Sequence, residues 1–213
     1  MTEIDLREAV VATARALNAH NLNRGAAGNV SVRCRDGFLV TPTGMACDET
    51  RPGDIAFMRM DGTSEGARKP SSEWRFHRDI YAARAEAGAI LHAHAPFATA
   101  LACLGCEIPP FHYMIARFGG KTVRCAEYAT FGTQALSDNA LAALEGRCAC
   151  LLANHGMLAF GRDLRHALDL AVEFESLCEQ YWRALQIGDP KLLTDAEMDT
   201  VLEKFRTYGQ QNG

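Results

Sequence analysis

Residues 89–96 have the sequence Ala-Ile-Leu-His-Ala-His-Ala-Pro, and this stretch decides how the fold is interpreted. Its apolar start predicts a short strand over 89–94, and Pro96 suits the first turn of a following helix. Successive side chains of a strand point to opposite faces, so His92 and His94 share one face. The stretch therefore predicts a strand that carries two imidazoles to a sheet end, where both can reach one metal ion.

The segments around this strand predict hairpins first and helix-flanked strands later. Asn29-Val-Ser-Val-Arg33 alternates like a strand, Arg35-Asp36-Gly37 is a hairpin signal, and strands are expected near 38–41 and 55–58. Helices are expected at about 3–22, 71–87, 134–144 and 164–187, and a last helix follows the capping box Thr194-x-x-Glu197. Further strands are expected at 121–125, 148–153 and 157–160. This order predicts an α/β fold with a central, mainly antiparallel sheet and helices on both faces.

Composition is that of a folded protein. The 213 residues are 48% hydrophobic and 23% charged, with a formal net charge of −4. These values exclude dominant disorder and a nucleic-acid binder held by bulk positive charge. One domain over residues 1–213 is expected, because no repeat or linker is visible. The sequence has no run of 18 apolar residues and no signal segment, so we expect a cytoplasmic protein with no membrane partner.

The cysteines are expected to be reduced core residues. There are eight of them: Cys34, Cys47, Cys103, Cys106, Cys125, Cys148, Cys150 and Cys178. A protein that is not exported seldom carries a disulfide framework. Cys103-x-x-Cys106 could be half of a structural zinc site, but core packing is the favoured interpretation.

Three histidines form the strongest candidate site. His155 follows the apolar stretch 148–153, at the end of another expected strand, as His92 and His94 do on theirs. Three imidazoles at strand ends would leave positions open for substrate, as a catalytic zinc requires. The alternative is a chance His-x-His pair and a turn histidine that binds nothing. Glu73, at the start of the 71–87 helix, is the best acid/base candidate, although it could equally be an ordinary helix-start glutamate.

Small and hydroxyl residues offer an anion site. Three short segments, 25–29 (Gly-Ala-Ala-Gly-Asn), 43–44 (Thr-Gly) and 71–72 (Ser-Ser), supply permissive backbone, N–H groups and hydroxyls. His77 shares a helix face with Glu73 and is interpreted as supporting structure. The four lysines lie outside apolar runs, which favours metal chemistry over imine chemistry. No G-x-S-x-G elbow is present, which disfavours a serine hydrolase.

The chain resembles the class II aldolase/epimerase family, which includes the sugar 1-phosphate aldolases. The resemblance covers nearly the whole chain and rests on these segments: Gly28-Asn-Val-Ser-Val-Arg33, Thr41-Pro-Thr-Gly44, Pro70-Ser-Ser-Glu-Trp-Arg-Phe-His77, His92-x-His94, His112-Tyr-Met-Ile115, Tyr128-Ala-Thr-Phe-Gly132, Asn154-His-Gly156 and Glu203-Lys-Phe-Arg-Thr-Tyr-Gly209.

This resemblance implies a three-layer α/β/α fold and a C4 homotetramer with active sites near subunit interfaces. It implies one Zn²⁺ per subunit on His92, His94 and His155, with Glu73 at the resting metal and acting as the acid/base. Tyr113 would come from a neighbouring subunit as a proton donor. The sugar phosphate would lie among Gly28, Asn29, Thr43, Gly44, Ser71 and Ser72, with Phe131 and Tyr208 at the aldehyde end. Ala26 departs from the hydroxyl residue that close members tend to have.

The implied reaction is zinc-dependent retro-aldol cleavage of a ketose 1-phosphate to dihydroxyacetone phosphate and a short aldehyde. Candidate substrates are L-fuculose 1-phosphate and 5-deoxy- or 5-methylthioribulose 1-phosphate, which the sequence does not separate. Two alternatives stay open: a ribulose-phosphate 4-epimerase, and a non-catalytic assembly domain like the adducin head.

Overall fold

One eight-stranded sheet organises the computed structural model, which describes residues 2–207. The strand order is β4-β3-β2-β1-β5-β8-β7-β6. Within the described range neighbouring strands are antiparallel, except for the parallel pair β6 and β7. The strands are β1 (Asn29–Cys34), β2 (Gly37–Val40), β3 (Ala56–Arg59), β4 (Ser64–Glu65), β5 (Ala89–Ala93), β6 (Cys125–Ala126), β7 (Ala149–Leu152) and β8 (Gly156–Gly161).

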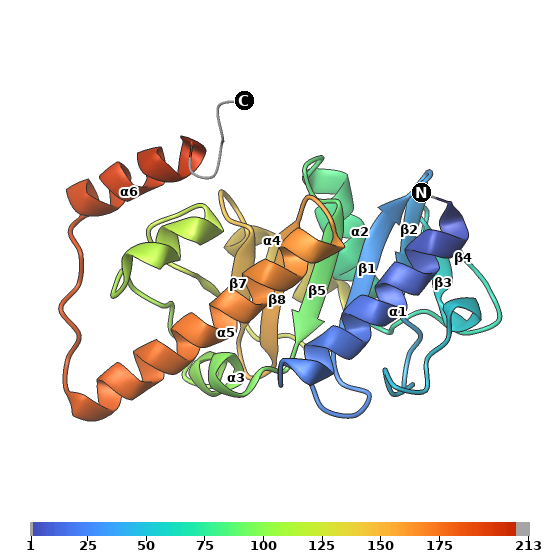
Figure 1. Cartoon of the computed structure of the whole chain (residues 1–213), viewed down its shortest axis with the longest axis horizontal. Helices are drawn as coiled ribbons and strands as arrows, with labels where there is room; N and C mark the ends of the chain where they lie inside the picture. The colour runs from blue at the N-terminus through green and yellow to red at the C-terminus, as the bar shows by residue number, and fades with distance from the viewer. Residues whose placement is uncertain (1, 208–213) are drawn as a thin grey trace.

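Helices cover both faces of this sheet, which confirms the expected three-layer α/β/α architecture. One apolar cluster packs α1, α3 and α5 against one face, and a second packs α2 and α4 against the other. Figure 1 shows α5 and α1 crossing the same face of the sheet. The helices are α1 (Glu3–Ala19), α2 (Trp74–Ala83), α3 (Pro96–Ala102), α4 (Gln134–Ala143), α5 (Leu164–Ile187) and α6 (Asp195–Thr207), with 3₁₀ turns η1 (Pro52–Asp54) and η2 (Tyr113–Phe118).

The longest helix illustrates why the sequence folds this way. In α5 the buried residues recur at helical spacing, so a single apolar stripe faces the sheet. The Asp163 side chain caps the helix by accepting a hydrogen bond from the His166 backbone N–H at 2.7 Å. At the start of α6, Thr194 and Glu197 form the reciprocal hydrogen bonds of the expected capping box. The expected boundaries of α5 are confirmed.

Several expected elements are shorter than the sequence suggested, among them α1, which ends at Ala19 and not near residue 22. The helix expected over 71–87 begins at Trp74, with Glu73 as its N-cap, and ends at Ala83. Arg84 leaves the helical conformation because the chain must turn toward Gly88, which lies against the backbone of Arg162 with no room for a side chain. The strand expected over 121–125 is confined to β6, while Val123 forms an isolated bridge to Ile108.

None of the described helices is both long and apolar enough to cross a bilayer. The eight cysteines are free thiols, as expected, and four of them, Cys34, Cys47, Cys150 and Cys178, are buried. The expectation of core packing is wrong for Cys103 and Cys106, which are exposed.

Candidate active site

Sheet pairing brings the three candidate metal-binding histidines together. His92 lies on β5, His94 follows that strand, and His155 lies in the turn between β7 and β8. Strand β8 pairs with both β5 and β7, which places the turn beside the end of β5. One nitrogen from each of the three imidazoles lies within 4.8 Å of the others. The structure therefore assembles the trio that was predicted from the sequence.

The imidazoles are held in a form that can bind a cation. His92 Nδ1 lies 2.9 Å from the carbonyl oxygen of Met157 and donates to it, which leaves Nε2 as a free acceptor 3.0 Å from His94 Nε2. Burial lowers the pKa of His92 to about 3 and that of His155 to about 4, and it also lowers the pKa of His94. All three rings are therefore neutral at ordinary pH, which is the metal-binding form.

Glu73 adds a carboxylate to the same cluster. Its Oε2 lies 3.3 Å from His92 Nε2, and its Oε1 lies 3.4 Å from His155 Nε2. Burial raises the pKa of Glu73, while His155 and a hydrogen bond from Asn29 oppose that rise. The Oε1 atom is buried and has no hydrogen-bond partner among residues 2–207. An orphaned carboxylate oxygen among three neutral imidazoles fits a divalent cation with nitrogen and oxygen ligands.

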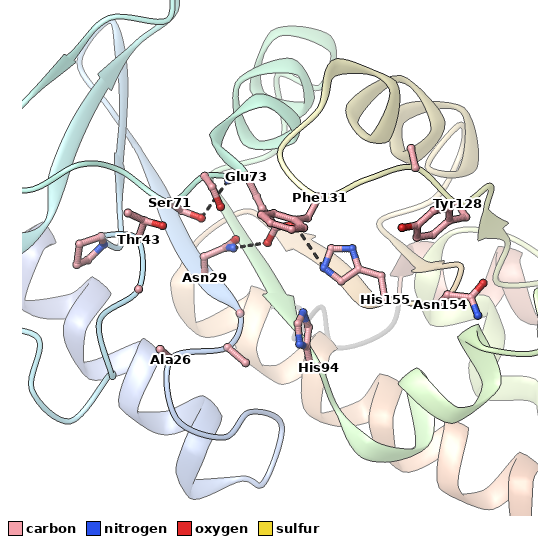
Figure 2. Close-up of a pocket in the computed structure, with 16 residues that line it drawn as sticks. Ala26, Asn29, Thr43, Ser71, Glu73, His94, Tyr128, Phe131, Asn154 and His155 are labelled. Carbon is pink, nitrogen blue, oxygen red and sulfur yellow. Dashed lines mark hydrogen bonds and ion pairs between the residues drawn. The ribbon is translucent and has the colours of Figure 1, made fainter.

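A cavity of about 340 Å³ opens beside this cluster. It is lined by Ala26, Ala27, Gly28, Asn29, Pro42, Thr43, Gly44, Ser71, Ser72, Glu73, His94, Tyr128, Ala129, Phe131, Asn154 and His155. Figure 2 shows Thr43, Ser71 and Asn29 on one side of Glu73, and His155, Tyr128 and Asn154 on the other. Every predicted phosphate-site residue is in this lining, as is Phe131. No Lys or Arg is among these described lining residues, so an anion here would be held by amides and hydroxyls.

One described residue, Tyr113, is not brought to this cavity. Tyr113 lies on η2, is 51% exposed, and lines a different cavity together with Arg117 and His166. Within one chain it does not meet Glu73, so its role across a subunit interface stays a prediction. Tyr208 lies outside the described residues.

Some lining residues had no role assigned from the sequence. Tyr128 is 62% exposed at the cavity, which is also lined by the similarly exposed Phe131. Asn154 has a left-handed backbone conformation, with φ of 55°. It lies in the turn between β7 and β8, immediately before His155. One signal in the sequence could have drawn attention to Asn154. It is an asparagine, a residue that tolerates positive φ, at an expected turn after an apolar strand and next to a histidine.

Gly28 is expected to be the least replaceable glycine of the site. Its φ is +71°, and a Cβ there would lie 2.5 Å from the carbonyl oxygen of His92 and against the Asn23 side chain. Gly28→Ala should therefore lower the free energy of unfolding by about 2–5 kcal/mol, from left-handed strain plus overpacking. Gly25, at φ +63° with open space around it, is the matched control, and Gly25→Ala should cost only about 1–2 kcal/mol. Urea denaturation measures the free energy of unfolding of both variants. Equal losses in the two would contradict a steric clash at Gly28.

The chain belongs to the family described as Class II Aldolase and Adducin N-terminal domain, whose sequence model matches residues 8–182. It is an enzyme of the class II aldolase type, which performs retro-aldol cleavage, and the predicted family and activity are confirmed. The family suggests a divalent metal, which the histidine cluster suits.

Two named relatives and one solved structure are similar to this chain over nearly its whole length. A Rhodospirillum rubrum protein named 5-methylthioribulose-1-phosphate/5-deoxyribulose-1-phosphate aldolase is 57% identical over 208 residues, covering 98% of this chain and 94% of its own. L-fuculose phosphate aldolase of Escherichia coli K12 is 45% identical over 205 residues, which cover 96% of this chain and 95% of that protein. A solved structure of L-fuculose 1-phosphate aldolase superposes with a TM-score of 0.91 at 42% identity, covering 95% of this chain and 96% of the other.

Proposed function

We propose that this enzyme cleaves 5-methylthioribulose 1-phosphate and 5-deoxyribulose 1-phosphate. The products would be dihydroxyacetone phosphate with methylthioacetaldehyde or acetaldehyde, respectively. The observation that carries this choice is the 57% identity to the Rhodospirillum rubrum relative named for both substrates. L-Fuculose 1-phosphate is the second candidate, on the 45% identity to the Escherichia coli relative named for it.

The two sides of the cavity support this substrate class. Thr43, Ser71 and Asn29 offer hydroxyl and amide groups to a phosphate on one side. Phe131 and Tyr128 offer aromatic surface elsewhere in the lining, which suits the methyl or thioether end of the sugar better than a hydroxyl. His94, His155 and Glu73 line the same cavity (Figure 2).

Zn²⁺ is the proposed metal, held by His92, His94 and His155. When bound, it would supply positive charge close to the oxygen that becomes negative as the C3–C4 bond breaks. Glu73, the proposed acid/base, would then deliver a proton to C3 of the three-carbon fragment to complete dihydroxyacetone phosphate. Its buried, unpartnered Oε1 is the atom available for that transfer.

Further proposals concern the role of Tyr113, the oligomeric state, the domain organisation and the location of the enzyme. Tyr113 would transfer a proton at the aldehyde-side oxygen of a neighbouring subunit's site, within a homotetramer. Its exposure, and its position in a cavity separate from Glu73, agree with a role across an interface. We also propose that the enzyme is cytoplasmic and that it has one domain. The single eight-stranded sheet supports the proposal of one domain.

A substrate panel tests the proposed function. The zinc-loaded enzyme would receive the 1-phosphates of 5-methylthioribulose, 5-deoxyribulose, fuculose and ribulose, with dihydroxyacetone phosphate detected through glycerophosphate dehydrogenase. We expect kcat/KM for the first two to exceed that for fuculose 1-phosphate at least tenfold, which corresponds to about 1.4 kcal/mol of differential binding. A higher value for fuculose 1-phosphate would reverse the substrate assignment.

The same panel separates the other candidate functions. Conversion of a ribulose phosphate to its 4-epimer, without release of dihydroxyacetone phosphate, would identify a 4-epimerase. No turnover of any ketose 1-phosphate, with zinc measured in the protein, would favour a non-catalytic domain of the adducin type.

A further inference from the structure

A line of buried polar side chains leads from Glu73 into the layer between the sheet and α2. Asn29 Nδ2 donates to Glu73 Oε2 over 2.9 Å, and Asn29 Oδ1 lies 2.6 Å from His77 Nε2. His77 Nδ1 lies 2.7 Å from Ser31 Oγ, which lies 2.8 Å from the Tyr81 hydroxyl. Each of these side chains is at most 7% exposed. The inner members of the line, His77, Ser31 and Tyr81, are at most 2% exposed, so bulk water cannot replace a partner lost there.

The Glu73 end of the line determines the direction of each hydrogen bond. An ionised carboxylate only accepts, so Asn29 must present its NH₂ group to Glu73 and its carbonyl oxygen to His77. His77 must then carry its proton on Nε2 to donate to that oxygen. In a neutral imidazole the other nitrogen, Nδ1, is left as an acceptor, and the Ser31 hydroxyl donates to it. The Tyr81 hydroxyl in turn donates to Ser31.

The surroundings of His77 keep its ring neutral, so that it donates from one nitrogen and accepts at the other. The ring is fully buried and packs against Phe76 and Phe38, at centroid distances of 4.7 and 6.2 Å. Burial lowers the pKa of His77 to about 3, so the ring stays neutral and cannot donate from both nitrogens. Burial raises the pKa of Tyr81, so its hydroxyl keeps the proton it donates.

We propose that His77 is a positioning residue of the reaction: through Asn29 it holds Glu73 Oε2 as a hydrogen-bond acceptor and leaves Oε1 to exchange the proton with C3. If Asn29 turned over, its carbonyl oxygen would face the carboxylate, and its NH₂ group would face the Nε2–H of His77. Both contacts would be repulsive, so His77 keeps the amide in its working orientation. The assignment rests on the proposed role of Glu73, and it adds a residue that itself touches neither substrate nor metal.

The first test reads the protonation of His77 directly and needs no activity. Long-range ¹H–¹⁵N NMR of the wild-type protein, with the His77 signals assigned by their loss in His77→Gln, should show a neutral ring protonated at Nε2 from pH 5 to 9. The spectrum should be the same with and without zinc. A ring protonated at Nδ1, or one that titrates in this range, would overturn the proposed direction of the line.

The second test separates positioning from simple support. His77→Phe keeps an aromatic ring but removes both nitrogens, whereas His77→Gln keeps an N–H donor near the position of Nε2. We expect kcat per zinc-loaded site to fall at least tenfold in His77→Phe, with KM changed less than threefold. On a logarithmic scale, His77→Gln should recover at least half of the kcat that is lost in His77→Phe. We expect this recovery whether or not the Tm of His77→Gln exceeds that of His77→Phe.

Leu144→Ala is the matched control, because Leu144 belongs to the same apolar cluster as α2 and has no part in the site. It should lower Tm and keep the wild-type kcat. Wild-type kcat in His77→Phe, or a kcat that follows Tm across all three variants, would reduce His77 to a packing residue. A fully active Glu73→Gln would instead refute the acid/base role, which distinguishes failure of that proposal from failure of this one. If His77→Phe does not fold, the NMR measurement on the wild type still decides the direction of the line.

Discussion

Glu73→Gln is expected to lower kcat by about 10²–10⁴-fold, the usual contribution of a positioned general acid or base. Glutamine keeps the shape of the side chain and an oxygen near the imidazoles, but it cannot exchange a proton. Among the described residues, Oε1 of Glu73 has no hydrogen-bond partner. The His155 nitrogen 3.4 Å away is a proposed metal ligand, so it cannot take over the proton transfer. Steady-state kinetics on the zinc-loaded variant, with the metal content measured, gives the result.

A half-buried glutamate, Glu175, provides the control for this substitution. Glu175 caps α3 through the backbone N–H groups of Phe97 and Ala98, at 2.7 and 2.8 Å, and does not line the cavity. Glu175→Gln should therefore keep kcat within about threefold of the wild type, because the ordinary effect of losing such a cap is on stability. Wild-type turnover by Glu73→Gln would remove the acid/base role.

His155→Ala is expected to abolish stoichiometric metal binding together with turnover. Loss of a residue that only orients a ligand costs about 10–100-fold in metal affinity, and loss of a ligand itself should cost more. The remaining pair, His92 and His94, would offer two imidazoles in place of three. Zinc titration by calorimetry measures the affinity, and the aldolase assay is run on the same samples.

The matched control for this substitution is an exposed histidine. His20 lies at the end of α1, outside the cavity, so His20→Ala should bind zinc and turn over like the wild type. If His155→Ala retains one tightly bound zinc per chain, the metal lies elsewhere.

Local patterns made much of the fold predictable. The helix over 164–187 has a regular apolar stripe and an Asp cap, and its boundaries were predicted as observed. The start and end of α2 were not, because they depend on contacts distant in the sequence, such as the approach of Gly88 to the backbone of Arg162. Short β6 likewise depends on its parallel partner β7 rather than on its own sequence.

The site was predictable where a spacing or a motif marks it. The alternation of a strand places His92 and His94 together, and the turn after an apolar strand marks His155. The line from Glu73 through Asn29 to His77 and Ser31 alternates between α2 and β1, two segments distant in the sequence, so only the tertiary structure reveals it. The His77 side chain was expected to support the site, and the structure shows which atoms it contacts.

One measurement tests the central claim most directly: exchange of hydrogen at C3 of dihydroxyacetone phosphate, the reverse of the proposed proton delivery. The zinc-loaded wild type would be incubated with dihydroxyacetone phosphate alone in D₂O and followed by ¹H NMR. We expect one of the two C3 hydrogens to be replaced by deuterium, with no aldehyde required, and we expect this exchange to stop after chelation and in Glu73→Gln. A zinc-loaded wild type that exchanges neither hydrogen would contradict the account, as would exchange at the wild-type rate by Glu73→Gln.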